Sequence, residues 1–141
     1  MSLNVIDFQN EVAAPWKDKV PQRQNPLSVV SVGRDKALLR VREDIIISRS
    51  DLRVRSVDPE QAEMLARAAG SRLWIFCFTV ELPKLVYLAC SIRRYSSGSR
   101  LLMLSGLREP GFEESLFHRT IRPLDGPEGF LNAVSTLALE A

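Results

Sequence analysis

Four short segments, three of them apolar and each followed by polar residues, constrain the fold of this chain more than any other feature. Residues 27–32 precede Gly33-Arg34-Asp35, residues 73–76 precede Cys77, residues 101–104 precede Ser105, and residues 118–121 precede Arg122-Pro123. Each apolar run predicts a buried strand. Each closing residue then lies at the carboxyl end of a strand, which is where open α/β sheets place their functional sites.

Helix-like segments alternate with these strands, and this alternation predicts a parallel sheet wrapped by helices. Asp35 is expected to cap a helix in which Leu38, Val41 and Ile45 share a face. Residues 52–57 alternate in polarity, as an edge strand does. Three further residues then form a helix start with a capping box: Asp58, Pro59 and Gln61.

Two later helices are predicted from the same kind of pattern. One begins near Pro83 and leaves Arg93 and Arg94 outside, with a core face made of Leu85, Leu88, Ala89 and Ile92. Cys90 is assigned to the core as well. The last helix is capped by Asp125 and turns Phe130, Val134 and Leu137 inward.

Two stretches fit this alternation less well. Residues 105–122 contain Pro110 and Gly111 and few apolar residues, so the helix expected there is short or irregular. Residues 1–26 contain three prolines and are expected to form an N-terminal arm ahead of one domain over residues 27–141. Either the arm is loosely ordered, or Trp16 docks it on the domain or on a second copy.

The order and spacing of these segments resemble the receiver domain of bacterial response regulators, the CheY-like family. The resemblance implies a flavodoxin-like, doubly wound, five-stranded parallel sheet in the order 2-1-3-4-5, with helices on both faces. In that family an acidic pair holds magnesium and an aspartate at the end of a later strand accepts the phosphoryl group. A Ser or Thr and a Lys-Pro pair complete the family's site.

The matching positions here hold Gly33 and Arg34, Cys77, Ser105, and Arg122-Pro123, with Asp35 one place beyond the pair. Gly33 has no side chain, Arg34 is a cation, and a thiol is a soft ligand that suits magnesium poorly. We therefore expect a degenerate phosphorylation site with no metal and no cofactor.

The remaining side chains of this site are expected to satisfy one another. The resemblance places Arg34 and Arg122 near Asp35, which favours either an internal Arg–Asp pair or a bound anion, and the internal pair is the simpler arrangement. Ser105 is expected to hydrogen-bond to the turn at Gly106.

The resemblance implies a signal-transduction domain that acts by protein contact, a pseudo-receiver rather than an enzyme. Its partner would be another protein or a second copy of the chain. Receivers often use the face of the fourth helix, fifth strand and fifth helix, which here would include Arg119, Ile121 and Phe130. The basic third helix, with Arg93 and Arg94, is the alternative face.

Two other functions start from different residues. A small cysteine-dependent enzyme or redox protein would use Cys77, activated by neighbouring cations, but the one histidine, His118, is predicted at the opposite edge of the sheet. Nucleic-acid binding would use four arginines without interleaved exposed aromatic residues and is not expected: Arg93, Arg94, Arg100 and Arg108.

The composition of the chain indicates its expected partners and cellular location. The net charge of +2 does not argue for nucleic acid, and two cysteines inside apolar runs give no disulfide framework. The chain has no stretch near the roughly 20 apolar residues of a membrane span and no signal-peptide pattern. We expect a cytoplasmic protein with no membrane contact.

Overall fold

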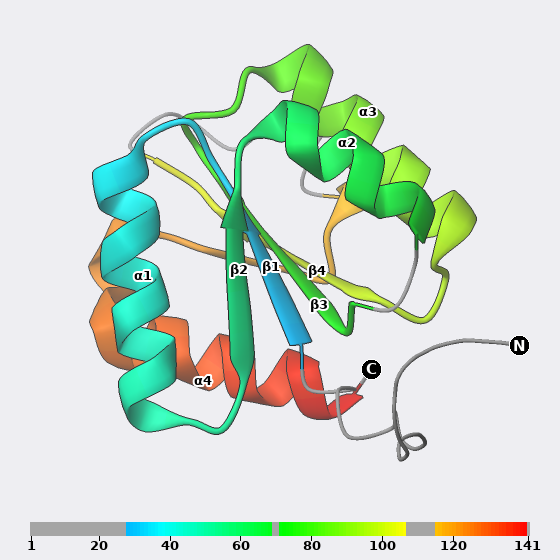
Figure 1. Cartoon of the computed structure of the whole chain (residues 1–141). Helices are drawn as coiled ribbons and strands as arrows, with labels where there is room; N and C mark the ends of the chain where they lie inside the picture. The colour runs from blue at the N-terminus through cyan, green and yellow to red at the C-terminus, as the bar shows by residue number, and fades with distance from the viewer. Residues whose placement is uncertain (1–27, 69–70, 107–114, 141) are drawn as a thin grey trace, which may run out of the picture.

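The computed structural model describes residues 28–68, 71–106 and 115–140, which form a five-stranded sheet between two layers of helices (Figure 1). In chain order the elements are β1 (Ser28–Val32), α1 (Lys36–Arg49), β2 (Arg53–Val57), α2 (Pro59–Ala68), β3 (Leu73–Cys77), α3 (Leu82–Tyr95), β4 (Arg100–Leu104), β5 (Arg119–Ile121), the 3₁₀ helix η4 (Pro123–Asp125) and α4 (Gly126–Glu140).

All neighbouring strands pair in parallel, in the order β2-β1-β3-β4-β5. This confirms the doubly wound, flavodoxin-like fold. The central strand β3 is buried over its whole length, and β2 lies at an edge with alternating burial, as predicted. Because the strands are parallel, their carboxyl ends lie along one edge of the sheet.

The side chains of each strand alternate between two cores. Trp74 and Phe76 face α2 and α3, where they pack with Leu85, Leu88 and Met103. Leu73 and Ile75 face the other side, where the core includes Ile46, Leu102, Val134 and Leu137 of α1, β4 and α4. Each large apolar side chain buried this way contributes about 1.5–3 kcal/mol, so the two cores hold the strand ends in place.

Two of the three predicted caps are confirmed. The Asp35 carboxylate accepts hydrogen bonds from the amides of Ala37 and Leu38, at 3.0 and 3.3 Å. Asp58 and Gln61 form the reciprocal capping box, with the Gln61 amide 2.8 Å from Asp58 Oδ1 and the Asp58 amide 3.1 Å from Gln61 Oε1.

The prediction that Asp125 caps the last helix is wrong. Its carboxylate accepts a hydrogen bond from the Arg122 amide at 2.7 Å, and so closes η4 rather than capping α4. Gly126 then joins η4 to α4 with φ of +66°, a conformation that favours glycine. The extra turn changes how the chain leaves β5.

Helix α1 buries a different face from the one predicted. Its buried residues are Leu39 and Ile46, while Val41 is 54% exposed. Leu38, Val41 and Ile45 do share a face, but that face is only partly buried: it lines a surface hollow, and Ile45 also packs against the core. The predicted face was therefore one helix position away from the buried one.

Helix α3 buries the four predicted residues and leaves Arg93 and Arg94 exposed. The assignment of Cys90 to the core is wrong, because this residue is exposed. One residue advances an α-helix by about 100°, which carries Cys90 past the buried Ala89 and into solvent.

Some predictions lie outside the described residues. They are the N-terminal arm of residues 1–26, with Trp16, and most of the segment expected to hold a short fourth helix, residues 107–114. Within the described ranges, no helix is long and apolar enough to span a membrane.

Candidate functional site at the carboxyl edge of the sheet

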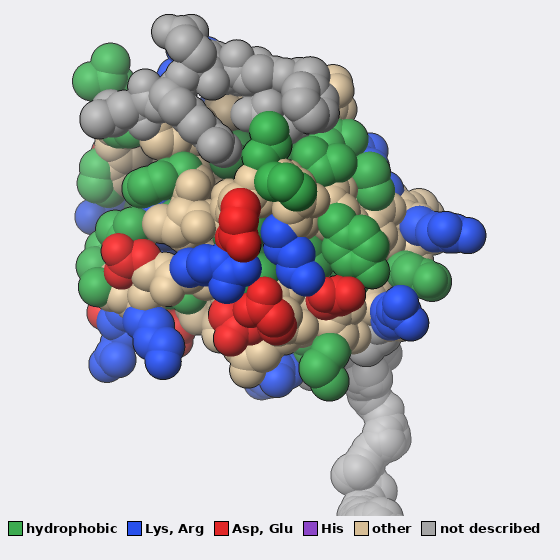
Figure 2. Space-filling model, turned by 90° about the horizontal axis from the view of Figure 1, so that it is seen from above, with side chains coloured by type: hydrophobic (Ala, Val, Ile, Leu, Met, Phe, Trp, Pro, Cys, Tyr) green, Lys and Arg blue, Asp and Glu red, His purple; other side chains and the backbone are tan. Residues whose placement is uncertain are grey.

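The loops that follow the strands meet at the carboxyl edge, which Figure 2 views from above. Acidic and basic side chains interleave in the middle of this surface, with hydrophobic side chains around them (Figure 2). The sequence-predicted positions Gly33, Cys77, Ser105 and Arg122 all lie at strand ends here. These positions differ in burial and in the contacts that they make.

Gly33 and Cys77 pack directly against each other at the centre of the edge. A Cβ atom added to Gly33 would lie 3.0 Å from the Cβ of Cys77, and 3.3 Å from both Leu39 Cδ2 and Thr79 Oγ1. Cys77 is only 1% exposed. A side chain at position 33 would therefore have to push these neighbours aside.

Arg42 of α1 is a site residue that the sequence analysis missed. Its Nη1 lies 2.9 Å from the Sγ of Cys77, and the contact is half-buried. The signal was present, because Arg42 falls on the inward side of α1 between Leu39 and Ile46. A basic residue on the buried side of an amphipathic helix indicates a specific contact.

Arg34 points away from Cys77 and binds two carboxylates. Its Nε and Nη2 lie 2.6 and 2.8 Å from Glu81, and its two terminal nitrogens lie 3.3 and 3.2 Å from Glu60. Its amide donates to Thr79 Oγ1 at 2.9 Å. For Arg34 the predicted pair with Asp35 is therefore wrong, because Asp35 caps α1 and Arg34 is held by residues of α2 and the β3–α3 loop.

These contacts shift the pKa values of the side chains that make them. The hydrogen bonds from Arg34 lower the pKa of Glu81 to about 2, and the same pair raises the pKa of Arg34 further. A second pair, Glu63 and Lys84 at 2.5 Å, links α2 to α3. Their hydrogen bond lowers the pKa of Glu63 and raises that of Lys84. Glu60, Glu63 and Glu81 are thus each paired with a cation of the same chain.

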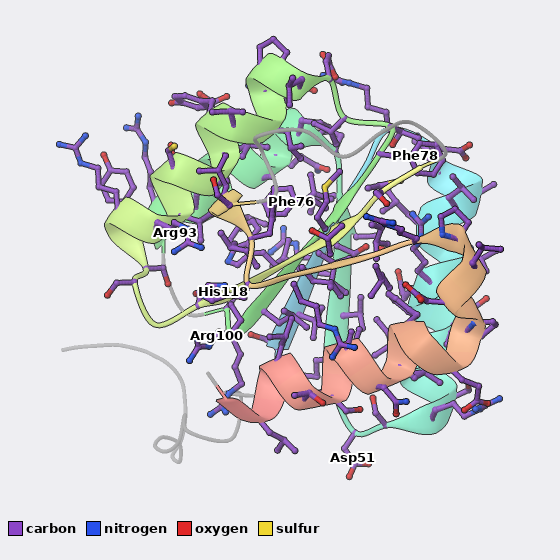
Figure 3. The ribbon with its side chains drawn as sticks, turned by 180° about the vertical axis from the view of Figure 1, so that it is seen from behind. Asp51, Phe76, Phe78, Arg93, Arg100 and His118 are labelled. Atoms are coloured by element: carbon purple, nitrogen blue, oxygen red, sulfur yellow. The ribbon has the colours of Figure 1, made fainter. Side chains whose placement is uncertain are left out.

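Ser105 is bound to the neighbouring strand. Its amide and its hydroxyl both donate to the carbonyl oxygen of Ile121, at 3.0 and 3.2 Å. This corrects the expected bond to the Gly106 turn. Gly106 instead lies under the ring of Phe78, since a Cβ there would be 3.1 Å from Phe78 Cγ. Phe78 itself is 40% exposed at this edge (Figure 3).

An apolar hollow of about 290 Å³ lies between α1 and α4, beside Ser105. Among the described residues that line it, the charged side chains are Arg42 and Arg122, and none is a carboxylate. The other lining residues are mostly apolar: Leu38, Val41, Ile45, Phe78, Leu104, Ser105, Ile121, Pro123, Gly126, Pro127 and Phe130. This chemistry fits an apolar group accompanied by negative charge.

The predicted interaction residues have different surroundings. Ile121 and Phe130 are buried, at 7% and 6% exposure, so they form the floor of the hollow rather than an exposed contact face, which corrects their assignment. Arg93 donates twice to the carbonyl oxygen of Leu116. Arg94 and Arg119 are exposed.

Cys77 and His118 do not form a catalytic pair. His118 immediately precedes β5, so it lies at the amino end of the sheet, whereas Cys77 ends β3 at the carboxyl edge. Its Nδ1 accepts a hydrogen bond from the Leu101 amide at 2.9 Å. Figure 3 shows His118 beside Arg100, well away from Phe78 at the carboxyl edge.

The residues at this edge do not fit magnesium. Magnesium prefers several oxygen ligands, but the central positions hold a glycine and a buried thiol with Arg42 against it. In the part of the chain that the structure describes, no three His, Cys, Asp or Glu side chains gather into a group that could hold a metal ion.

Solved structures with the same fold include a response regulator receiver protein from Sinorhizobium medicae, with a TM-score of 0.66 and 17% identity over 79% of this chain and 94% of that one. A putative pilus assembly protein from Burkholderia thailandensis gives 0.65 and 9%, over 79% and 98%. A protein described as an adenylate cyclase, from Rhodopirellula baltica, gives 0.68 and 14%, over 80% and 87%. No family model and no curated protein matches the chain. These similarities establish the receiver fold.

Proposed function

We propose that this chain is a pseudo-receiver: a signalling domain that acts through protein contacts and does not undergo magnesium-dependent aspartyl phosphorylation. The contact between Gly33 and Cys77 carries this proposal. It occupies the place where the resemblance puts one of the acidic pair and the phospho-accepting aspartate. Neither residue supplies a carboxylate.

The charges around this contact support the same conclusion. Transfer of a phosphoryl group to a carboxylate needs a metal ion that bridges the phosphate oxygens. Arg42 brings a guanidinium to Cys77, and Arg34 already binds Glu60 and Glu81. Asp35, the nearest carboxylate in sequence, is committed to capping α1.

A non-enzymatic role is part of this proposal. The two nucleophile candidates of the edge are Cys77 and Ser105, and their hydrogen bonds are to Arg42 and to the Ile121 carbonyl rather than to a general base. The adenylate cyclase among the structural neighbours shares only the fold, and a fold hosts many activities. A cytoplasmic location fits the two free thiols.

The chemical half of the proposal is tested with acetyl phosphate, a small phosphoryl donor, and excess magnesium, followed by intact-mass spectrometry. We expect no gain of a phosphoryl group under conditions that modify a receiver with the full acidic site. A hydroxylamine-sensitive phosphoryl adduct on this chain would overturn the proposal.

The binding half is tested by capturing proteins from source cells and identifying them by mass spectrometry. We expect one partner to bind equally with and without magnesium and beryllofluoride, and to be lost with Arg94→Glu or with Arg119→Glu. Arg40→Glu, at another exposed arginine, is the matched control. A partner captured only with magnesium and beryllofluoride would contradict the proposal, as would capture unaffected by both variants.

A further inference from the structure

The hollow between α1 and α4 has an exposed apolar rim. Val41 and Phe78, which line it, are 54% and 40% exposed, and Leu124, next to the lining residue Pro123, is 99% exposed. Exposed apolar side chains gathered around a recess mark a binding site more often than a chance surface. The described residues leave this recess open.

Charge narrows what can occupy the hollow. In the part of the lining that the structure describes, the charged side chains are both arginines, and the Arg122 side chain is exposed. A binding segment with apolar side chains and carboxylates would bury its apolar side chains in the hollow and pair its carboxylates with the guanidinium groups. A basic segment would be repelled.

The first part of this chain has that composition. Residues 3–12 hold two carboxylates, Asp7 and Glu11, and the chain has no lysine or arginine before Lys17. Five apolar residues lie among them: Leu3, Val5, Ile6, Phe8 and Val12. We propose that residues 3–12 bind in the hollow between α1 and α4 of their own chain.

The connecting segment is long enough for this contact. Residues 13–27 join the proposed binding segment to the start of β1. At about 3.3 Å per residue they span up to about 50 Å. The five residues of β1 cover only about 17 Å along the strand, from the amino end of the sheet to its carboxyl end. A tether of this kind raises the effective concentration of the segment to the millimolar range, so a weak contact is enough to fill the hollow.

The consequence is a covered binding site. A partner with the same apolar and acidic chemistry would have to displace residues 3–12, which makes the arm a competitor for the hollow. This inference does not depend on the loss of phosphorylation, because the phosphodonor test and the test below give separate results.

The test uses the full chain with a nitroxide spin label near the proposed segment. Gln9→Cys carries the label in a Cys90→Ser background, because Cys90 is exposed, whereas Cys77 is 1% exposed and protected. We expect the amide signals of Val41, Ile45 and Phe130 to lose most of their intensity relative to the reduced sample. The signals of α2 on the other face should keep theirs.

Charge variants give the matched comparison. With Asp7→Lys and Glu11→Lys together the intensity losses should disappear, whereas Lys17→Glu and Lys19→Glu together, in the connecting segment, should leave them in place. Losses that persist after reversal of Asp7 and Glu11 would overturn the charge argument, and losses spread evenly over the domain would overturn the contact. Losses on an isotope-labelled chain mixed with a separate spin-labelled chain would assign the hollow to a second copy and overturn binding within one chain.

Discussion

Over α2 and α3, the carboxyl edge of the sheet carries Arg34 held between Glu60 and Glu81, whereas over α1 and α4 the same edge is an apolar hollow with two arginines in its lining. The first half has paired its charges internally. The second half has apolar surface, and the charged side chains among its described lining residues are Arg42 and Arg122. Gly33 and Cys77 lie in contact between the two.

Under the function proposed above, the fold keeps the position of the site while the residues there have a different chemistry. In the polar half, each carboxylate that contacts Arg34 is already neutralised by it, so little remains to attract a metal ion. In the apolar half, the exposed side chains contribute little to the core and are available for binding. The proposed binding surface at this edge is therefore on the side of α1 and α4.

The largest expected effect comes from forcing a carboxylate between the two halves. Gly33→Asp should destabilise the domain by about 3 kcal/mol, because its Cβ would crowd Cys77 and its charge would enter a buried position. Urea unfolding measures this change. Gly98→Asp is the control, since no atom lies within 4 Å of a Cβ there, and should change stability by about 0.5 kcal/mol or less. Equal stabilities of the two variants would show that the edge has room for an acidic residue.

Arg42 belongs to the apolar half and contacts the residue between the halves. Arg42→Ala should destabilise the domain by about 1–2 kcal/mol, because it removes the half-buried contact with Cys77 and the packing of its methylene groups. Arg40→Ala, two positions earlier and exposed, should cost less than about 0.5 kcal/mol. If both variants unfold at the same urea concentration, Arg42 does not support the edge.

The polar half should respond to pH. The pKa of Glu81 is lowered from 4.5 to about 2 in the folded chain, so its stabilising contribution is complete above pH 4.5 and is lost as pH falls toward 2. Glu81→Gln removes this contribution at every pH. The stability difference between wild type and Glu81→Gln, measured by urea unfolding from about pH 6 to pH 2, should therefore narrow as pH falls. A constant difference would mean that the Arg34 pair does not stabilise the fold.

The smallest effect is expected on the rim of the hollow. Val41→Asp should change stability by less than about 0.5 kcal/mol, because Val41 is 54% exposed. Leu39→Ala, on the buried side of the same helix, should cost about 2–3 kcal/mol. A comparable loss in both variants would show that the rim is part of the core rather than a binding surface.

The sequence predicted the order of strands and the helix caps at Asp35 and Asp58, because apolar periodicity and capping are local patterns. It did not predict the partners of Arg34, which lie 26 and 47 residues away, or that of Cys77, which lies 35 residues away. Those contacts depend on how the loops pack after the strands align. The resemblance implied an Arg–Asp pair at Asp35, but the Asp35 carboxylate accepts local hydrogen bonds from the start of α1, and Arg34 binds Glu60 and Glu81 instead.

The exposed Cys90 and Val41 show a second limit of prediction from the sequence. Periodicity identifies an apolar helix face within about one residue, and one residue is the difference between burial and exposure on a helix. In α1 the face that was predicted to be buried lines the hollow instead, and the hollow is the surface proposed for binding.

The central claim is that the carboxyl edge no longer holds magnesium or an acyl phosphate. An amide NMR titration with magnesium and then beryllofluoride, which mimics an acyl phosphate, tests it directly at Cys77, Ser105 and Arg122. The account predicts no saturable shifts at these amides in a folded sample at millimolar ligand. Localised, saturable shifts at the three positions would contradict it and would show that the site still works as a phosphorylation switch.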